Sequence, residues 1–284
     1  GVKDALMQVV VDDDGVQMTI NHFATNPPDL LLILQASFAD STMVRQIAEA
    51  VDAPLLLWAL PEARTGGRLR LNSFCGINLA GHSLKRAGFD YDYIYAQPED
   101  EKALAKVNAY ANAATVKARL KTARIGRVGE NPAGFETCLY DGQTLSERFG
   151  VEVVQLELES VFAGARHADQ QKVNAVEATV RETVSGLDDV HAEEARGTLS
   201  TYVTLNDIAE TQDLHGMAVR CWPEFFTDLG CSACGAMSMM SNNFKPCSCE
   251  ADVNGTITQL ILQWMSGEPA FGTVMVDFDV ADDT

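Results

Sequence analysis

Residues 29–35 read Asp-Leu-Leu-Leu-Ile-Leu-Gln, and residues 54–59 read Pro-Leu-Leu-Leu-Trp-Ala. Each is a short, continuous apolar run, which is typical of a strand buried on both faces of a parallel sheet. Between the two runs, residues 41–51 carry apolar side chains at helical spacing. A strand, a helix and a second strand within about 30 residues make the crossover unit of a parallel sheet, so this stretch predicts an α/β fold.

Further strands and helices follow a polar, glycine-containing break at residues 62–68. The patterns predict strands at 91–95, 124–128, 151–156 and 217–221, helices at 79–86, 99–122 and 252–266, and one or two exposed helices within 163–197. Residues 274–280 alternate apolar and polar side chains, as a half-buried strand does. We therefore expect two Rossmann-like parallel-sheet domains, at 1–66 and 67–266.

The charge of the chain narrows the classes of partner. It holds 40 acidic and 21 basic residues, a formal net charge of −19, and such a surface repels the phosphate backbone of nucleic acids. The apolar runs are all shorter than the ~18 residues that a membrane-spanning helix requires. We expect neither nucleic acid nor a membrane as a partner.

The seven cysteines predict a reducing environment. Their number is odd, the chain is long and no secretory leader is visible, so a disulfide framework is not expected. We accordingly expect the protein to work in the cytoplasm.

Two closely spaced cysteine pairs, Cys231-x2-Cys234 and Cys247-x-Cys249, raise the question of a zinc site. The second pair is one residue shorter than the paired CxxC knuckles of structural zinc sites, and methionines fill the interval between the pairs. We therefore predict a buried cluster of free thiols packed beside methionine. The histidines show no metal-ligand spacing, and the chain has no P-loop, no GxSxG elbow and no full dinucleotide fingerprint.

The predicted geometry brings two acidic residues in the last third of the chain close together. Glu250 stands just before the helix predicted at 252–266, which runs roughly 22 Å outward. The strand at 274–280 returns, so Asp277 comes back to the level of Glu250. Two adjacent carboxylates repel unless a cation or a shared proton relieves them, and oxygen ligands suit Mn²⁺ or Mg²⁺. The spacing alone leaves open that both are ordinary surface acids.

The region around Glu250 resembles a known family. The segments Asn72-Ser-Phe-Cys-Gly-Ile-Asn78, Cys221-Trp-Pro-Glu-Phe225, Cys249-Glu-Ala-Asp-Val-Asn-Gly255 and Gly267-Glu-Pro-Ala-Phe271 resemble the L-fucose isomerase/L-arabinose isomerase family, and above all its shorter fucose-isomerase-like members. The resemblance runs through essentially the whole chain, and the segment holding Glu250 is its most specific part. It implies two α/β domains followed by a β-rich C-terminal domain, whose start is then residues 267–284.

The resemblance also implies an activity. Members interconvert an open-chain aldose and its ketose through an enediol, using Mn²⁺ or another divalent ion bound by two acids that correspond to Glu250 and Asp277. The resemblance gives the same two residues the catalytic roles: one carboxylate takes the proton from carbon and the other serves the opposite face or the oxygen, with the assignment left open. The family's third protein ligand is a histidine of the C-terminal domain, and no histidine of this chain occupies that position. The resemblance thus implies that the chain lacks the start of the N-terminal domain and most of the C-terminal one. Members are trimers or hexamers, so we expect a homo-oligomer.

Secondary roles follow from the same resemblance. Asp252 is expected to cap the following helix and so orient Glu250, and Glu224 is expected to contact the sugar. Trp222 either stacks on the sugar or packs in the core. Two alternatives stay open: a non-catalytic sugar-binding module, and an isomerase of a sulfonated or acidic sugar. The second requires basic residues near the metal, for which Arg127 and Arg220 are the candidates, although each equally suits a structural role.

Overall fold

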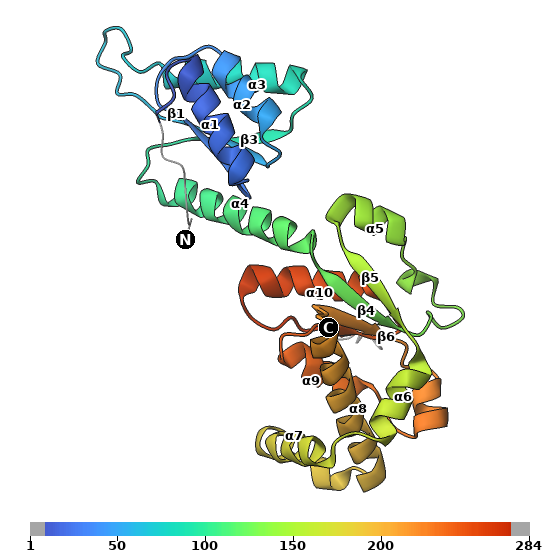
Figure 1. The fold of residues 1–284 in the computed structure, drawn as a ribbon. Helices are drawn as coiled ribbons and strands as arrows, with labels where there is room; N and C mark the ends of the chain where they lie inside the picture. Colours follow the sequence, from blue (N-terminus) through green and yellow to red (C-terminus); the bar gives the residue numbers. More distant parts are fainter. Residues whose placement is uncertain (1–8, 274–284) are drawn as a thin grey trace. The chain divides into compact units, whose positions relative to one another are not determined.

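The computed structural model describes residues 9–273, which form two compact units, each built on a parallel sheet (Figure 1). The first unit is Gly1–Ala118 and the second is Arg119–Thr284. All strand pairs in the described residues are parallel, so the predicted α/β class with two parallel-sheet domains is confirmed. The strand predicted at 274–280, Asp277 within it and most of the expected third domain lie outside the described residues.

The first unit holds a three-stranded sheet in the order β1-β2-β3. Its strands are β1 (Leu31–Gln35), β2 (Leu55–Ala59) and β3 (Tyr91–Tyr95), and its helices are α1 (Asp13–Thr25), α2 (Thr42–Ala50), α3 (Ser73–Arg86) and α4 (Glu101–Leu120). Every residue of the central strand β2 is buried. Leu55 and Leu57 pack with α1, α2 and α3, whereas Leu56 and Trp58 pack with α4. Alternate side chains of one apolar run therefore serve two cores, as the unbroken pattern of residues 54–59 predicts.

The domain boundary expected at residues 66/67 is wrong. β2 pairs with β3 along its whole length, so the polar break between them lies within one sheet unit. The break is the loop that connects β2 to α3, and it is organised by Glu62, whose carboxylate accepts hydrogen bonds from the backbone N–H of Leu71 and Asn72, both at 3.0 Å. Glycine and polar composition marks a loop in either case, and only the strand pairing distinguishes a connection from a boundary.

The second unit holds a four-stranded sheet in the order β5-β4-β6-β7. Its strands are β4 (Arg124–Val128), β5 (Glu152–Leu156), β6 (Gly216–Val219) and β7 (Cys247–Ser248), and its helices are α5 (Gly142–Phe149), α6 (Leu158–Arg166), α7 (Gln170–Thr183), α8 (Ala192–Thr211), α9 (Cys234–Asn242) and α10 (Val253–Ser266). The region expected to hold one or two exposed helices thus contains parts of α6 and α8 and all of α7. Seven residues of α8 between Leu199 and Ala209 are buried, and Leu205 and Ala209 among them belong to the core beside the sheet.

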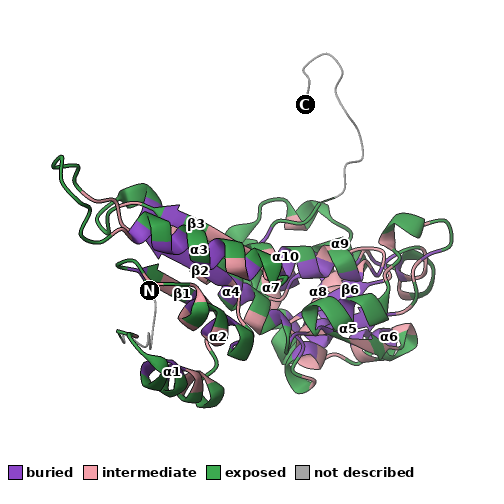
Figure 2. Cartoon of the chain, turned by 90° about the horizontal axis from the view of Figure 1, so that it is seen from above, coloured by how far each residue is buried: buried purple, intermediate pink, exposed green. Residues whose placement is uncertain are grey.

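Sulfur-containing side chains form part of the larger core of the second unit. Cys221, Cys231 and Cys247 are buried beside Met237 and Met240, and all seven cysteines of the chain are free thiols. This confirms the predicted cluster of free thiols beside methionine for these residues. Cys234 is an exception, since it begins α9 and is exposed. Burial is densest along β2, β4 and β6 and on the helix faces turned toward them (Figure 2).

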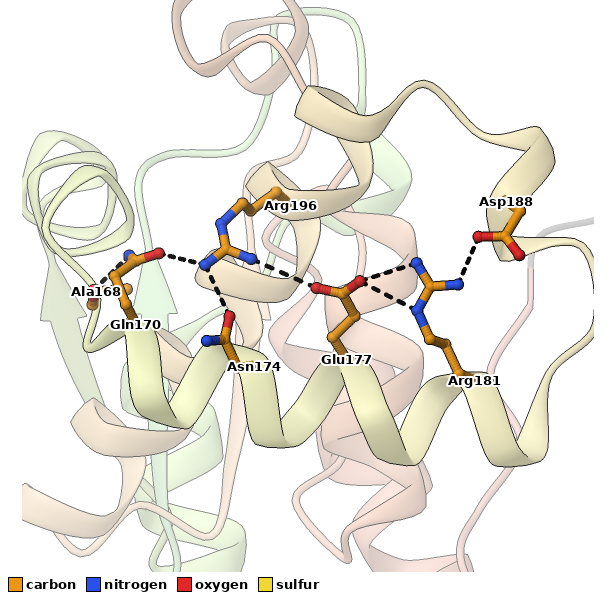
Figure 3. Close-up of polar contacts among 7 residues, drawn as sticks. All are labelled: Ala168, Gln170, Asn174, Glu177, Arg181, Asp188 and Arg196. Atoms are coloured by element: carbon orange, nitrogen blue, oxygen red, sulfur yellow. Dashed lines mark hydrogen bonds and ion pairs between the residues drawn. The ribbon is translucent and has the colours of Figure 1, made fainter.

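Helix α7 is attached to α8 by a small apolar contact and a polar network. Val173 is the buried residue of α7 and packs against Leu199 and Val203. Arg196 reaches from α8 to Glu177 at 3.4 Å and also contacts Gln170 and Asn174, while Arg181 pairs with Glu177 and Asp188 (Figure 3). These ion pairs are exposed, so each contributes little to stability. None of the helices in residues 9–273 is both long and apolar enough to cross a membrane.

Candidate active site

The residues singled out by sequence follow the carboxyl ends of neighbouring strands. Glu250 comes just after β7, Arg220 directly follows β6, and Asn131 lies in the loop after β4. The chain passes from β4 outward to β5 and then returns to β6 on the other side of β4. Such a reversal is the point at which open α/β sheets bind their ligands, beyond the carboxyl ends of the strands. The loop at 129–135, which follows β4, lies at this reversal.

The carboxylate of Glu250 has one oxygen in contact with thiols and one without a partner. Oε1 lies 3.4 Å from Sγ of Cys221 and 3.6 Å from Sγ of Cys249. Oε2 is buried and forms no hydrogen bond within the described chain. A buried carboxylate oxygen without a partner is costly, so its position is explained best by a cation, a proton donor or a substrate that is bound there in the working protein.

The backbone at Glu250 is also unusual. Glu250 and Ala251 have φ angles of +56° and +53°, in the left-handed region that residues with a side chain rarely adopt. The side chain of Asn131 holds this turn, donating hydrogen bonds to the backbone oxygens of Glu250 at 2.9 Å and of Ala251 at 3.1 Å. Left-handed residues cost of order 1–3 kcal/mol each and persist where surrounding contacts fix them, often at functional sites. Asn131 is therefore a structural link between the β4 loop and Glu250.

Arg127 supports this link from the sheet. Its side chain is buried, donates from Nη2 to Oδ1 of Asn131 at 2.7 Å and pairs with Glu130 at 2.8 Å. Its guanidinium also lies 5.3 Å from the ring centre of Tyr140. These contacts fix the amide of Asn131 with its N–H₂ group turned toward the Glu250 turn. Between the two roles left open for Arg127, the structure thus shows the structural one.

Asp252 anchors the other side of the turn. Its carboxylate accepts a hydrogen bond from Gly255 N at 2.9 Å and caps α10, as predicted. Behind it, the hydroxyl of Ser248 lies 2.6 Å from that of Thr256, which donates to the backbone oxygen of Met217 in β6 at 2.7 Å. The turn that presents Glu250 is therefore held by the helix, by β6 and by the β4 loop.

The segment after β6 contributes an ion pair and an exposed ring. Arg220 donates from Nε and Nη2 to the two carboxylate oxygens of Glu224, at 2.8 and 2.5 Å. This hydrogen-bonded pairing with Arg220 lowers the pKa of Glu224, so the carboxylate is ionised at neutral pH. Trp222 is 52% exposed and meets Phe226 edge-on, with ring centres 5.6 Å apart. The core alternative for Trp222 is wrong, because its indole is accessible to a ligand.

Cys221 and Cys249 form a close thiol pair beside Glu250. Their sulfur atoms are 2.8 Å apart, and a hydrogen bond from Cys249 lowers the pKa of Cys221, although burial and the carboxylate of Glu250 oppose this shift. The same hydrogen bond raises the pKa of Cys249. Cys221, Cys249 and Glu250 are the one group of three potential metal-binding side chains found in residues 9–273. The spaced pairs Cys231/Cys234 and Cys247/Cys249 do not come together as such a group within these residues.

Sequence reasoning identified part of this arrangement. It selected Glu250, Asp252, Trp222 and Glu224, which the structure places on the segments that follow β6 and β7. It missed the roles of Asn131 and Cys221. Asn131 contacts Glu250 from 119 positions earlier in the chain, and Cys221 contacts it from 29 positions earlier. The usable signal was their position, since Cys221 is the last residue of the strand predicted at 217–221 and Asn131 comes three residues after the strand predicted at 124–128.

Comparison with known proteins shows which proteins the chain resembles. Residues 3–121 match the family model described as "Fucose/sulfoquinovose isomerase, N-terminal domain". The chain is 29% identical over 259 residues to the sulfoquinovose isomerase of Clostridium sp. (strain MSTE9), covering 90% of this chain, and 28% identical over 242 residues to that of Alkalicoccus urumqiensis, covering 85%. Residues 3–121 thus resemble the N-terminal domain of fucose and sulfoquinovose isomerases, and most of the chain is similar to sulfoquinovose isomerases.

The match to this N-terminal domain model agrees with the observed division of the chain. The family's N-terminal domain model ends one residue after α4, close to the observed boundary between Ala118 and Arg119 and far from the expected one at 66/67. The similarity to the curated relatives continues through most of the second unit. The chain spans 58% and 54% of the lengths of the two relatives named above, so it corresponds to little more than half of either.

Proposed function

We propose that this chain is part of an aldose–ketose isomerase that moves a proton between C1 and C2 of an open-chain monosaccharide through an enediol. The observation that carries the proposal is the Glu250 carboxylate, which has a buried, unpartnered oxygen at the ligand-binding edge of the sheet. Because the relatives named above are called sulfoquinovose isomerases, we further propose a sulfonated hexose as the substrate, rather than the unsubstituted L-fucose or L-arabinose type first expected.

A divalent metal ion fits the residues present. Oε2 of Glu250 is buried without a partner and offers the oxygen ligand that Mn²⁺ or Mg²⁺ prefers, while the nearby thiols contact the other oxygen. We propose Glu250 and, by the family resemblance, Asp277 as the residues that hold the ion. When bound, such an ion supplies positive charge that polarises the carbonyl and hydroxyl oxygens of the sugar.

The residues of the chain have distinct tasks in this mechanism. The Glu250 carboxylate accepts a proton from the substrate and returns it, as a general base and then a general acid. Asn131 and Asp252 keep the turn at Glu250 in place, so that the carboxylate meets the reacting carbon without rearranging. Trp222 offers an exposed face on which the apolar side of a sugar ring stacks.

The sulfonate group needs a positive partner, and the two arginines nominated from the sequence are already engaged. Arg220 is paired with Glu224, and Arg127 with Glu130 and Asn131. Recognition of the sulfonate by Arg220 therefore requires that the substrate displace Glu224. We also propose that the protein works in the cytoplasm and as a homo-oligomer; the seven free thiols support the first point.

The proposal is tested with the full-length protein. Metal is removed with a chelator and Mn²⁺ is added back, and ketose formation from sulfoquinovose, L-fucose and L-arabinose is followed by NMR. We expect Mn²⁺-dependent turnover of the sulfonated sugar, and a fall in kcat of roughly 10²–10⁴-fold in Glu250→Gln. Glu182→Gln removes an exposed acid of α7 and is the control that keeps full activity.

The alternatives give different results. Binding of a sugar without turnover, in protein that Mn²⁺ does not stabilise, would support the non-catalytic sugar-binding module. Turnover of L-fucose in preference to the sulfonated sugar would keep the isomerase mechanism and reject the proposed substrate. Unchanged kcat in Glu250→Gln would reject the mechanism itself.

A further inference from the structure

A cavity of about 320 Å³ lies at the opposite edge of the second unit's sheet from Glu250. His215, which directly precedes β6, and Lys245, which precedes β7, line it together with Arg119 and Trp264. Glu250 comes after β7, at the carboxyl end of the strands. Because the four residues of β6 rise roughly 13 Å between these edges, the cavity is separate from the proposed active site.

Two cations of this cavity have no acidic partner among residues 9–273. The guanidinium of Arg119 stacks over Trp264, 4.0 Å from the ring centre, and Nζ of Lys245 donates to the backbone oxygen of Leu214 at 3.0 Å. Neighbouring Arg124, in contrast, pairs with Glu152 at 3.0 Å. In a chain of net charge −19, two unpaired cations in one cavity make a local positive potential that attracts an anion.

His215 adds a neutral donor to the two cations. Its Nδ1 accepts a hydrogen bond from the backbone N–H of Arg124 at 3.3 Å, which assigns the ring proton to Nε2. Burial lowers the pKa of His215, and the positive charges of Lys245, Arg119 and Arg124 lower it further, while Asp213 opposes them. The ring is thus an uncharged N–H donor at neutral pH, beside a guanidinium and an ammonium.

Gln263, which also lines the cavity, sets a further requirement for the ligand. Its side chain is only 4% exposed, its Nε2 donates to the backbone oxygen of Phe244 at 3.2 Å, and its Oε1 has no hydrogen-bond partner in the described chain. A buried acceptor of this kind is satisfied by a ligand that carries an O–H or N–H group. The ligand should therefore combine an anionic group with hydrogen-bond donors.

We propose that this cavity binds a small polyhydroxylated organic phosphate. Three separate donors, from Arg119, Lys245 and His215, match the three terminal oxygens of a phosphate monoester better than the two of a carboxylate. A hydroxyl of the same molecule donates to Oε1 of Gln263. The volume of about 320 Å³ is at the lower end of ligand sites, which suits a pentose or hexose phosphate. The proposal is independent of the isomerase function, because it uses none of the residues near Glu250.

Calorimetric titration of the full chain in 150 mM salt tests the proposal, with ribose 5-phosphate, inorganic phosphate and ribose as the three probes. We expect saturable binding of ribose 5-phosphate, weaker binding of inorganic phosphate and none of ribose. Arg119→Gln and Lys245→Gln should each weaken the binding of ribose 5-phosphate about 10-fold or more, since hydrogen bonds to charged groups are lost.

Lys117→Gln is the matched control, because it removes one exposed charge from the same helix without touching the cavity. It should bind ribose 5-phosphate as the unaltered protein does. Equal weakening by Lys117→Gln would show diffuse attraction and overturn the proposal, as would equal binding of ribose and its phosphate or no saturable binding. Arg119 is exposed, so Arg119→Gln should fold even where Lys245→Gln does not, which circular dichroism checks.

Discussion

Glu250 is held through its backbone and left free at one oxygen of its side chain. Asn131 fixes the carbonyls of the left-handed turn, and the thiols of Cys221 and Cys249 approach only Oε1. A side chain fixed in this manner has little freedom to turn toward water or toward another donor. The free oxygen is therefore preorganised for a ligand rather than for a structural hydrogen bond.

The first test at the level of single residues removes the amide of Asn131. Asn131→Ala should lower the free energy of unfolding by about 1–3 kcal/mol, because buried carbonyls lose their donor, and should lower kcat roughly 10–100-fold with KM little changed. Urea unfolding and steady-state kinetics of the full-length protein measure these quantities.

Two companion variants separate the donor from the volume of Asn131. Asn131→Asp keeps the shape but lacks the N–H₂ donor, so it should lose as much kcat as Asn131→Ala. Asn174→Ala is the control: it removes an exposed amide of α7 that contacts Arg196 of α8, and it should leave kcat unchanged. A normal kcat in Asn131→Asp would show that the amide does not position Glu250.

The ion pair of Glu224 with Arg220 predicts a pH dependence. The pKa of Glu224 is lowered below its ordinary 4.5, chiefly by the hydrogen bonds from Arg220, so the pairing stabilises the fold above that pH and is lost as pH falls through the lowered pKa. The stability difference between the natural protein and Glu224→Gln should therefore be largest near pH 7 and shrink below pH 4.5. Urea titrations between pH 3.5 and 7 measure it, and a difference that does not change with pH would contradict the account.

Residue identity alone predicted the acids of the site but not their neighbours. The Cys-Glu-Ala-Asp segment marked Glu250 and its helix cap, because a cap and the acid before it are local features. The contacts of Asn131 and Cys221 with Glu250 depend on which strands lie side by side, and that information is not local. Asp277, the partner proposed from the predicted strand at 274–280, lies outside the described residues and stays a prediction.

Among the elements, helix α10 connects the site to the second core. Asp252 caps its first turn, while Ile257 and Leu260 are buried on its inner face. A cap of this kind contributes about 0.5–2 kcal/mol. Because the cap lies two residues after Glu250, a disturbance of the first turn of α10 should reach the carboxylate.

Asp252→Ala tests that coupling. We expect the free energy of unfolding to fall by about 1 kcal/mol and kcat to fall as well, because the turn before the helix loosens. Asp169→Ala removes the equivalent cap of α7, away from the site, and should cost similar stability with no change in kcat. The same kcat in both variants would show that the cap has no role beyond holding its helix.

The elements that sequence patterns predicted best are the long apolar or strongly amphipathic ones. β1, β2, β3 and β4 were located to within two residues, and β1 and β2 stand out because each is a continuous apolar run. The patterns missed α1, α5 and α9, and they missed β7, which is only two residues long. β7 forms because Met217 and Ala218 of β6 pair with it, and no local pattern of Cys247 and Ser248 reveals that.

At the scale of the molecule, strand pairing and family similarity give the same division of the chain. The first unit ends at Ala118 and the matched N-terminal domain at residue 121. The misplaced boundary at 66/67 came from composition, which cannot tell a loop inside a sheet from a linker between domains. A relatively long polar loop within one unit was the simpler interpretation of residues 62–72.

Metal binding predicts a change in the stability of the whole protein. A ligand that binds only the folded state adds about 2.7 kcal/mol at a hundred times its dissociation constant, so Mn²⁺ should raise the Tm of the full-length protein by a few degrees. Glu250→Gln should abolish the increase, and Glu182→Gln should retain it. Scanning calorimetry with and without Mn²⁺ measures both, and an equal increase in Glu250→Gln would place the ion elsewhere.

The most direct test of the central claim, that Glu250 transfers a proton on the sugar, is hydrogen exchange. The full-length, Mn²⁺-loaded protein is incubated in D₂O with sulfoquinovose, and deuterium at C2 of the recovered aldose is measured by NMR. We predict enzyme-dependent exchange at C2 that falls at least roughly 100-fold in Glu250→Gln and persists in Glu182→Gln. Exchange in Glu250→Gln at the rate of the unaltered protein would contradict the account.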